Sequence, residues 1–297
     1  MKILAAIPCY NEEATIGSVV LKAKRHVDEV LVIDDGSVDD TARVAEEAGA
    51  KVIKHGGNRG YGAAIQSCFK YAKENDFDIM VILDGDGQHN PDEISVVIEP
   101  ILERKADISV GSRFLKEEHK NNVPLYRRFG IHVITWLTNL GSKKTRRVID
   151  AQSGFRGYSR KAIEKLDLKD EGMGVSTEIL LQARKRKLTI KEVPVGCRYD
   201  VEGSTEGSVK HGLGVVISII NYMEVEHSLL IFGVPGLVLV VIGLILGLRV
   251  YQTMMATGVL PIGSALITIM LLIVGSLLGI TGLILHAVII AGRRKWR

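Results

Sequence analysis

In residues 1–110, short apolar runs alternate with amphipathic helical patterns, and this alternation constrains the fold more than any other feature of the sequence. The apolar runs predict strands at Lys2–Pro8, Val30–Ile33, Lys51–Ile53, Ile79–Leu83 and Ile108–Val110. The segments between them predict helices at Ala14–His26, Asp40–Ala48, Gly62–Asn75 and Pro91–Arg104. Such a series predicts an α/β fold with a mainly parallel sheet and helices on both of its faces.

A polar cluster follows every one of these predicted strands. The clusters are Pro8–Glu13, Asp34–Ser37, Gly56–Gly62, Asp84–Gln88 and Gly111–Arg113. In parallel sheets, ligands bind beyond the carboxyl ends of the strands. One such cluster is ordinary loop chemistry, but a cluster after every strand predicts a binding site along this edge of the sheet.

The strongest candidate for chemistry is the stretch Asp84–Gln88, DGDGQ, at the end of the fourth predicted strand. Side chains two residues apart in an extended backbone point the same way, so Asp84, Asp86 and Gln88 are expected to converge. Two adjacent carboxylates repel unless a cation lies between them, and Mg²⁺ or Mn²⁺ prefers such oxygen ligands together with substrate phosphates. The pattern therefore predicts a metal-bound diphosphate. The alternative is a polar turn before a helix that begins near Pro91, with an Asp as its cap.

The glycine-rich loop Gly57–Gly62 and the pair Asp34-Asp35 point to a nucleotide. The loop has the order G-x-x-G-x-G and follows the third strand, whereas the dinucleotide fingerprint is G-x-G-x-x-G after the first strand. This difference argues against a hydride-transfer enzyme and leaves a nucleotide cradle or a flexible turn. Asp35 is predicted to contact a base or ribose, and a turn or helix-cap role is the alternative.

Composition narrows the class of protein further. The formal net charge is only +4, and no basic stripe with interleaved aromatic residues is present, so a nucleic-acid partner is not expected. The three cysteines, Cys9, Cys68 and Cys197, are widely spaced and odd in number. This usage predicts reduced thiols in a cytosolic domain.

Two long apolar stretches near the C-terminus predict a transmembrane hairpin. Leu229–Leu248 and Ile262–Ala291 are nearly free of charge and reach the roughly 20 residues that cross a bilayer. The basic tail Arg293–Arg297 predicts, by the positive-inside rule, that both termini and the N-terminal domain are cytosolic. Glycines four residues apart are expected to support close helix packing within the hairpin or between subunits. They are Gly243, Gly247, Gly275 and Gly279.

The predicted domain organisation has three parts. Residues 1–207 form a catalytic domain, residues 208–228 form juxtamembrane helices in the membrane interface, and residues 229–297 form the hairpin with its basic tail. The interfacial helices are inferred from an apolar face with charged ends directly before the first span. A core helix of the catalytic domain is the alternative for that segment.

The ordered motifs resemble those of glycosyltransferase family 2, which has the GT-A nucleotide-diphospho-sugar transferase fold. The resemblance rests on PCYNEE, DDGSVDDT, NRGYGAA, DGDGQH, GSR, SGFRGY and EVPVGCRY, and it covers the whole predicted soluble part. It implies that a set of residues binds the nucleotide, namely Pro8, Tyr10, Glu12, Asp35, Asp84 and Arg113. It also implies that Asp84, Asp86 and Gln88 bind the metal.

The second half is similar to polyprenyl-phosphate glycosyl synthases of the dolichyl-phosphate mannose and glucose synthase type. VPLYRRFG and HGLGVVISIINYMEVEHSLLIFGVPG carry this similarity. It implies that arginines bind the acceptor phosphate, and contact with anionic lipid is the alternative. The candidates are Arg113, Arg127 or its neighbour Arg128, and Arg198. The chain departs from the pattern at Ser204-Thr205, where the synthases usually have Ser-Lys.

These features predict a metal-dependent inverting glycosyltransferase. It would move a hexose from a nucleotide-diphosphate sugar to dolichyl or another polyprenyl phosphate, for glycan assembly. The catalytic candidates are Asp86, Arg127, Asp150 and Glu178, and salt bridges or helix caps are alternative roles for the last two. The resemblance favours a UDP-hexose donor over GDP-mannose and allows a homo-oligomer. A non-catalytic membrane scaffold on the same fold is the alternative of another class.

Overall fold

The computed structural model of the protein describes residues 1–116, 148–198 and 232–295, together with single positions between 118 and 139. The chain divides into two compact units, Met1–Ile219 and Ile220–Arg297. Arg127, Ser204 and the predicted interfacial helices at residues 208–228 lie outside the described residues.

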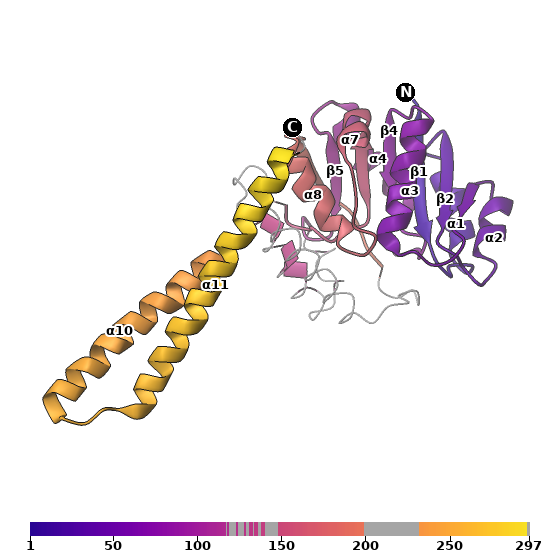
Figure 1. The fold of residues 1–297 in the computed structure, drawn as a ribbon. Helices are drawn as coiled ribbons and strands as arrows, with labels where there is room; N and C mark the ends of the chain where they lie inside the picture. The colour runs from indigo at the N-terminus through magenta and orange to yellow at the C-terminus, as the bar shows by residue number, and fades with distance from the viewer. Residues whose placement is uncertain are drawn as a thin grey trace. The chain divides into compact units, whose positions relative to one another are not determined.

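The described part of the first unit is built on a seven-stranded sheet (Figure 1). Its strands are β1 (Ile3–Cys9), β2 (Glu29–Asp34), β3 (Lys51–Lys54), β4 (Ile79–Ile82), β5 (Ile108–Ser112), β6 (Arg156–Ser159) and β7 (Ile190–Pro194). Their order in the sheet is β3-β2-β1-β4-β6-β5-β7. β6 runs antiparallel to β4 and β5, and the other described pairs are parallel. The predicted mainly parallel α/β sheet is confirmed, whereas the antiparallel β6 was not predicted.

Helices cover both faces of this sheet. They are α1 (Ile16–Ala23), α2 (Thr41–Glu47), α3 (Tyr61–Glu74), the 3₁₀ turn η1 (Pro91–Glu93) with α4 (Ile94–Leu102), α7 (Arg160–Lys165) and α8 (Val175–Lys185). Residues of α3, α7 and α8 belong to one hydrophobic cluster, and residues of α1 and α4 belong to the other. In β4, Met80 and Ile82 join the first cluster while Ile79 and Val81 join the second. A continuously apolar strand is therefore buried on both faces, because successive side chains point to opposite sides.

Parallel pairing gathers the loops that carry the motifs. β1 pairs with β2 on one side and with β4 on the other, both in parallel. The loops after these three strands therefore begin at the same edge of the sheet. β6 runs the other way, so the segment just before Arg156 reaches that edge as well. This arrangement brings Gly154 close to the end of β4.

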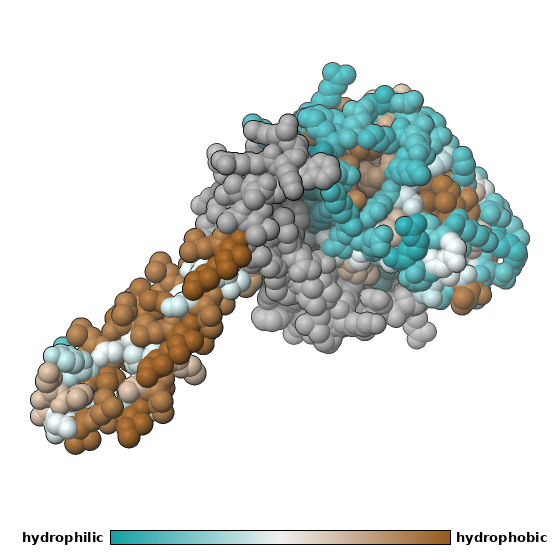
Figure 2. Space-filling view, viewed as in Figure 1, coloured by the Kyte–Doolittle hydropathy of each residue, from teal (hydrophilic) through white to brown (hydrophobic). Residues whose placement is uncertain are grey.

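The second unit contains two long helices, α10 (Val234–Thr257) and α11 (Ile262–Lys295). Both are long and apolar enough to cross a membrane, over Val234–Thr257 and Ile262–Ile284. Only 11% of the window in the first span and 17% of that in the second are buried, whereas a core helix of a soluble protein is mostly buried. Figure 2 shows the hydrophobic surface of the two spans.

The first of these helices differs from the predicted span. α10 continues beyond Leu248 to Thr257, so most of the chain between the two predicted spans is helical. The reason is that one arginine does not stop a helix, whereas Gly258 does: it adopts a left-handed conformation with φ of +68°.

Glycines hold α10 and α11 together. A Cβ atom on Gly236 would lie 2.7 Å from the carbonyl oxygen of Gly275 and 2.7 Å from the backbone nitrogen of Gly279. A Cβ atom on Gly243 would lie 2.9 Å from a side-chain carbon of Leu272. The predicted close packing within the hairpin agrees with the structure at Gly243, Gly247 and Gly275, and Gly236 is an additional member of the set, whereas a Cβ atom on Gly279 would meet no atom within 4 Å.

Candidate active site

The loops after β1 and β2 are fastened to each other. The backbone nitrogen of Asn11 donates to Ser37 Oγ (2.9 Å), and the nitrogen of Val38 donates to Asn11 Oδ1 (3.0 Å). Asn11 has a φ of +56°, which asparagine tolerates better than most residues. The nitrogen of Glu12 donates to Thr41 Oγ1 (2.7 Å) at the start of α2. These hydrogen bonds join the loop that carries PCYNEE to the loop that carries DDGS.

The DGDGQ segment forms a tight turn. β4 ends at Ile82, and Gly87 has a φ of +71°. Asp86 Oδ1 accepts a hydrogen bond from the backbone nitrogen of Gln88 (2.9 Å). Thr15 Oγ1 donates to the carbonyl oxygen of Gly85 (2.7 Å) and fastens the turn to the segment before α1. The convergence of Asp84, Asp86 and Gln88 was predicted for an extended backbone. The backbone turns here instead, so that assumption is wrong.

Asp84 is fixed from two sides. Tyr61, the first residue of α3, donates its hydroxyl to Asp84 Oδ1 (3.0 Å). Asp84 Oδ2 lies so close to Gly154 that a Cβ atom there would be 2.3 Å from it. Position 154 therefore requires glycine while Asp84 keeps this orientation.

Gln88 lies against the end of the β7 segment. Its carbonyl oxygen accepts from the backbone nitrogen of Arg198 (2.8 Å), and its side-chain Oε1 lies 3.8 Å from Cys197 Sγ. The nitrogen of Gly196 donates to the carboxylate of Glu93, with a shorter distance of 3.0 Å. Arg198 is exposed. The structure thus places a predicted phosphate-binding arginine directly beside the predicted metal-binding turn.

The acidic groups around this turn fit a divalent cation. Burial, together with the negative charges of Asp86 and Asp84, raises the pKa of Glu12 to about 7. All three carboxylates therefore lie near enough to repel one another, and a cation would relieve the repulsion. Within the described residues, no group of three or more His, Cys, Asp and Glu side chains forms a complete metal site. Mg²⁺ in proteins usually binds through one or two carboxylates together with water and substrate phosphates.

The raised pKa of Glu12 predicts a pH dependence of stability. The folded protein retains the Glu12 proton up to about pH 7, whereas the unfolded chain releases it near 4.5. Because the folded state binds more protons between these values, the free energy of unfolding falls as pH rises from about 4.5 to 7. We expect Glu12→Gln to be more stable than the parent at pH 8, by up to about 1 kcal/mol because Glu12 is half-exposed and its charge is screened.

Thermal unfolding of the detergent-solubilised full chain in EDTA, at pH 4.5 and pH 8, measures this effect. The exposed Glu164→Gln on α7 is the control and should behave like the parent at both values. A Glu12→Gln protein whose advantage is the same at pH 4.5 and pH 8 would show that the carboxyl is not perturbed.

Asp35 holds the glycine-rich loop. Its carboxylate accepts from the backbone nitrogens of Gly60 (2.8 Å) and Arg59 (3.1 Å), and from His55 Nδ1 (2.6 Å). Gly36, at a φ of +81°, packs so closely on Gly57 that a Cβ atom would lie 2.5 Å from the Gly57 carbonyl carbon. The loop is therefore anchored. A direct contact of Asp35 with a base or ribose stays a prediction.

Glu178 organises a second loop. Its carboxylate accepts from the backbone nitrogens of Lys169 (3.1 Å) and Asp170 (3.0 Å) and from Gln182 Nε2 (3.0 Å). This loop packs on the glycine-rich loop, because the nitrogen of Ala63 donates to the carbonyl oxygen of Glu171 (3.2 Å). These contacts favour the structural alternative over a catalytic role for Glu178.

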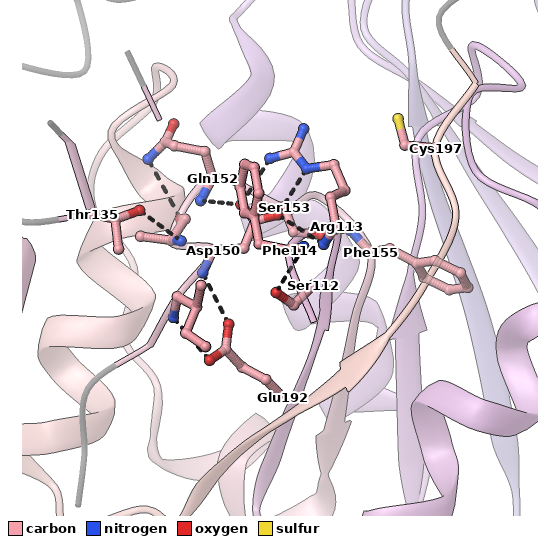
Figure 3. A network of polar contacts seen from close by, with 12 residues as sticks. Ser112, Arg113, Phe114, Thr135, Asp150, Gln152, Ser153, Phe155, Glu192 and Cys197 are labelled. Carbon is pink, nitrogen blue, oxygen red and sulfur yellow. Dashed lines mark hydrogen bonds and ion pairs between the residues drawn. The ribbon is translucent and has the colours of Figure 1, made fainter. Parts of the chain in front are cut away.

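Arg113 and Asp150 form a buried, two-pronged ion pair (Figure 3). Arg113 Nε lies 2.7 Å from Asp150 Oδ2, and one terminal nitrogen lies 2.7 Å from Oδ1. Burial alone would raise the pKa of Asp150, but the Arg113 charge and hydrogen bonds outweigh it and lower the pKa. Glu192 accepts from the backbone nitrogens of Ile149 (2.8 Å) and Asp150 (2.9 Å). The salt-bridge alternative for Asp150 is thus favoured, and nucleotide contact by Arg113 stays a prediction.

The other predicted residues lie around this edge. Pro8 is buried near the end of β1, and Tyr10 follows it half-buried. Arg128 donates from one terminal nitrogen to the carbonyl oxygen of Val123 (3.4 Å).

Sequence reasoning missed the roles of Thr15, Tyr61 and Arg156. Arg156 is fully buried and donates to the carbonyl oxygens of Ala151, Ser153 and Ser176 (2.7–2.8 Å), so it shapes the segment beside Asp84. Tyr61 lies within the motif NRGYGAA and Arg156 within SGFRGY. Their place in these motifs is the sequence feature that could have identified them as part of the site.

Relatives with named activities resemble this chain over most of its length. The UDP-N-acetylglucosamine–dolichyl-phosphate N-acetylglucosaminyltransferase of Methanococcus voltae is 35% identical, over 72% of this chain and 91% of its own. The dolichol-phosphate mannosyltransferase of Pyrococcus furiosus is 29% identical, over 70% of this chain and 60% of its own.

A solved structure shares the fold. Glucosyl-3-phosphoglycerate synthase from Mycobacterium tuberculosis, crystallised with Mn²⁺ and UDP-glucose, superposes with a TM-score of 0.59 over 75% of this chain and 78% of that chain. The identity is 23%, so the likeness shows the fold alone. The family described as "Glycosyl transferase family 2" matches residues 5–167, more than half of the sequence. With its GT-A sheet and D-x-D turn, the chain is a glycosyltransferase and belongs to glycosyl transferase family 2.

Proposed function

We propose that this enzyme transfers a hexose from a nucleotide-diphosphate sugar to dolichyl or another polyprenyl phosphate. The observation that carries the proposal is the pair of carboxylates Asp84 and Asp86, beside an anchored nucleotide-side loop and an exposed Arg198. Two membrane-length helices on the same chain suit an acceptor with a lipid tail. The named relatives support the acceptor class, since their names specify dolichyl or dolichol phosphate.

The donor is a UDP-sugar in this proposal. Its support is the relative from Methanococcus voltae, which is more similar to this chain than the mannosyltransferase from Pyrococcus furiosus is. GDP-mannose is the second candidate. The basic tail Arg293–Arg297 supports a catalytic unit and both termini on the cytosolic face.

Asp84 and Asp86 would hold Mg²⁺ or Mn²⁺, with Gln88 as the third proposed ligand. When bound, the metal would neutralise charge that develops on the departing diphosphate. An acceptor phosphate oxygen forms a bond to the anomeric carbon while the bond from that carbon to the diphosphate breaks. The electron pair of that bond leaves with the nucleoside diphosphate, and the sugar carbon is inverted.

Positioning matters more than proton removal in this reaction. A phosphate monoester with a second pKa of about 6 is already largely dianionic at neutral pH, so no general base is needed. Arg198 and the 127–128 arginines are the proposed acceptor-phosphate contacts, because guanidinium groups bind phosphate in a forked geometry.

Transfer of a radiolabelled sugar into lipid tests this function. Full-length protein in liposomes with dolichyl phosphate and Mn²⁺ receives labelled UDP-N-acetylglucosamine, UDP-glucose or GDP-mannose. We expect one UDP-sugar to label the organic phase, and the label to disappear when dolichyl phosphate is omitted. Labelling from GDP-mannose alone would overturn the donor assignment, and label that appears only in protein or another lipid would overturn the acceptor. If no donor supports transfer, the alternative of a non-catalytic membrane scaffold would be favoured.

A further inference from the structure

The hydroxyl of Tyr61 holds one of the two proposed metal-binding carboxylates. It donates to Asp84 Oδ1 (3.0 Å), while Asp84 Oδ2 rests against Gly154. A tyrosine hydroxyl is protonated at neutral pH and can donate to a carboxylate. A carboxylate restrained at both oxygens has little freedom to rotate.

The backbone before Tyr61 is held by the nucleotide side of the site. Asp35 accepts from the nitrogens of Arg59 and Gly60, the two residues that precede Tyr61. Gly60 has a φ of +100° and a backbone too close to the Glu171 carbonyl oxygen for any Cβ atom, which would lie 2.5 Å away. The start of α3 is therefore fixed from both sides.

We propose that Tyr61 is a positioning residue for Asp84, and that the Asp35–Gly60–Tyr61 tether couples the nucleotide half of the site to its metal half. The proposal rests on the proposed function insofar as Asp84 binds a metal. It assigns a reason for a tyrosine within an otherwise glycine-rich loop. Hydrogen bonds to a ligating carboxylate commonly account for 10–100-fold in metal affinity, which sets the expected effect.

Tyr61→Phe removes only the hydroxyl and tests the proposal without any transfer assay. The full chain in detergent is titrated with Mn²⁺, alone and with UDP or GDP, and the free ion is measured by electron paramagnetic resonance. We expect the apparent Kd for Mn²⁺ to rise roughly tenfold in Tyr61→Phe. In the transfer assay, the Mn²⁺ concentration for half-maximal rate should rise similarly, while the rate at saturating Mn²⁺ stays within a few-fold of the parent.

Tyr71→Phe is the matched control. Tyr71 lies on the same helix α3 and donates to another carboxylate, Glu29, which belongs to β2 and not to the site. Its loss should leave the Mn²⁺ affinity unchanged. Equal Mn²⁺ affinities in Tyr61→Phe and the parent, with or without a fall in melting temperature, would overturn the proposal.

Two further outcomes separate this proposal from the proposed function. A parent protein that binds no Mn²⁺ under any of these conditions would overturn the metal premise and the Tyr61 role together. A tenfold loss of Mn²⁺ affinity in Tyr61→Phe, in a protein that does not label dolichyl phosphate, would support the positioning role while overturning the acceptor.

Discussion

Asp86→Asn is expected to reduce glycosyl transfer by roughly 10³-fold while the protein stays folded. The substitution removes one of two negative charges at the proposed metal site. It keeps Oδ1, which accepts the hydrogen bond from the Gln88 nitrogen (2.9 Å), so the DGDGQ turn should survive. Since the charge of Asp86 contributes to the raised pKa of Glu12, its removal should also lower that pKa. Initial rates of label transfer at several Mn²⁺ concentrations measure the first effect, and thermal unfolding checks the fold.

Asp92→Asn supplies the comparison for this result. Asp92 lies just after the same turn, in η1, and its carboxylate is half-exposed beside His26 (3.2 Å). Its rate should stay near that of the parent. If Asp86→Asn transfers sugar as fast as Asp92→Asn in the presence of Mn²⁺, Asp86 has no part in holding the metal.

Asp150→Ala is expected to lower the free energy of unfolding by about 3–5 kcal/mol, because it leaves the Arg113 guanidinium buried without its carboxylate. Asp150 is fully buried, and both of its carboxylate oxygens lie 2.7 Å from Arg113 nitrogens. Urea or thermal unfolding of the solubilised protein measures the loss. Asp40→Ala breaks an exposed pair with Arg43 (2.7 Å), and its unfolding should stay close to that of the parent because solvent screens the pair.

Replacing both partners distinguishes pairing from catalysis. Arg113→Met combined with Asp150→Leu should be more stable than the sum of the two single losses, because no uncompensated charge remains buried. Unchanged stability in Asp150→Ala, together with lost transfer, would instead return Asp150 to the list of catalytic groups.

The sequence predicts a strand well where apolar side chains bury it on both faces. β1 and β4 read as continuous apolar runs because each is buried on both faces. β6 could not be predicted in this way, because its sequence, Arg156-Gly157-Tyr158-Ser159, is not a continuous apolar run. The burial of Arg156 is compensated by hydrogen bonds to three backbone carbonyl oxygens, and one of these carbonyls belongs to the distant Ser176. No local pattern contains that information.

The same limit applies to the site. The sequence places the carboxylates and loops on one edge, because parallel strands end together. The roles of Asp150 and Glu178 depend on partners elsewhere in the chain, such as Arg113 in β5's following turn, and a single residue type cannot reveal which partner it has. The geometry of DGDGQ was missed because Gly87, with a φ of +71°, allows the backbone to turn where an extended strand was assumed.

The antiparallel direction of β6 has a consequence for how this enzyme can diversify. β5 ends, and β6 begins, at the edge that carries Asp84 and Asp86, because the two strands run in opposite directions. The chain therefore leaves the sheet after Ser112 and re-enters it at Arg156, both on the catalytic side. At the two ends of this connection Arg113 pairs with Asp150 and Gly154 packs on Asp84, so a chimeric protein should keep residues 113–116 and 148–155 and exchange only the chain between them.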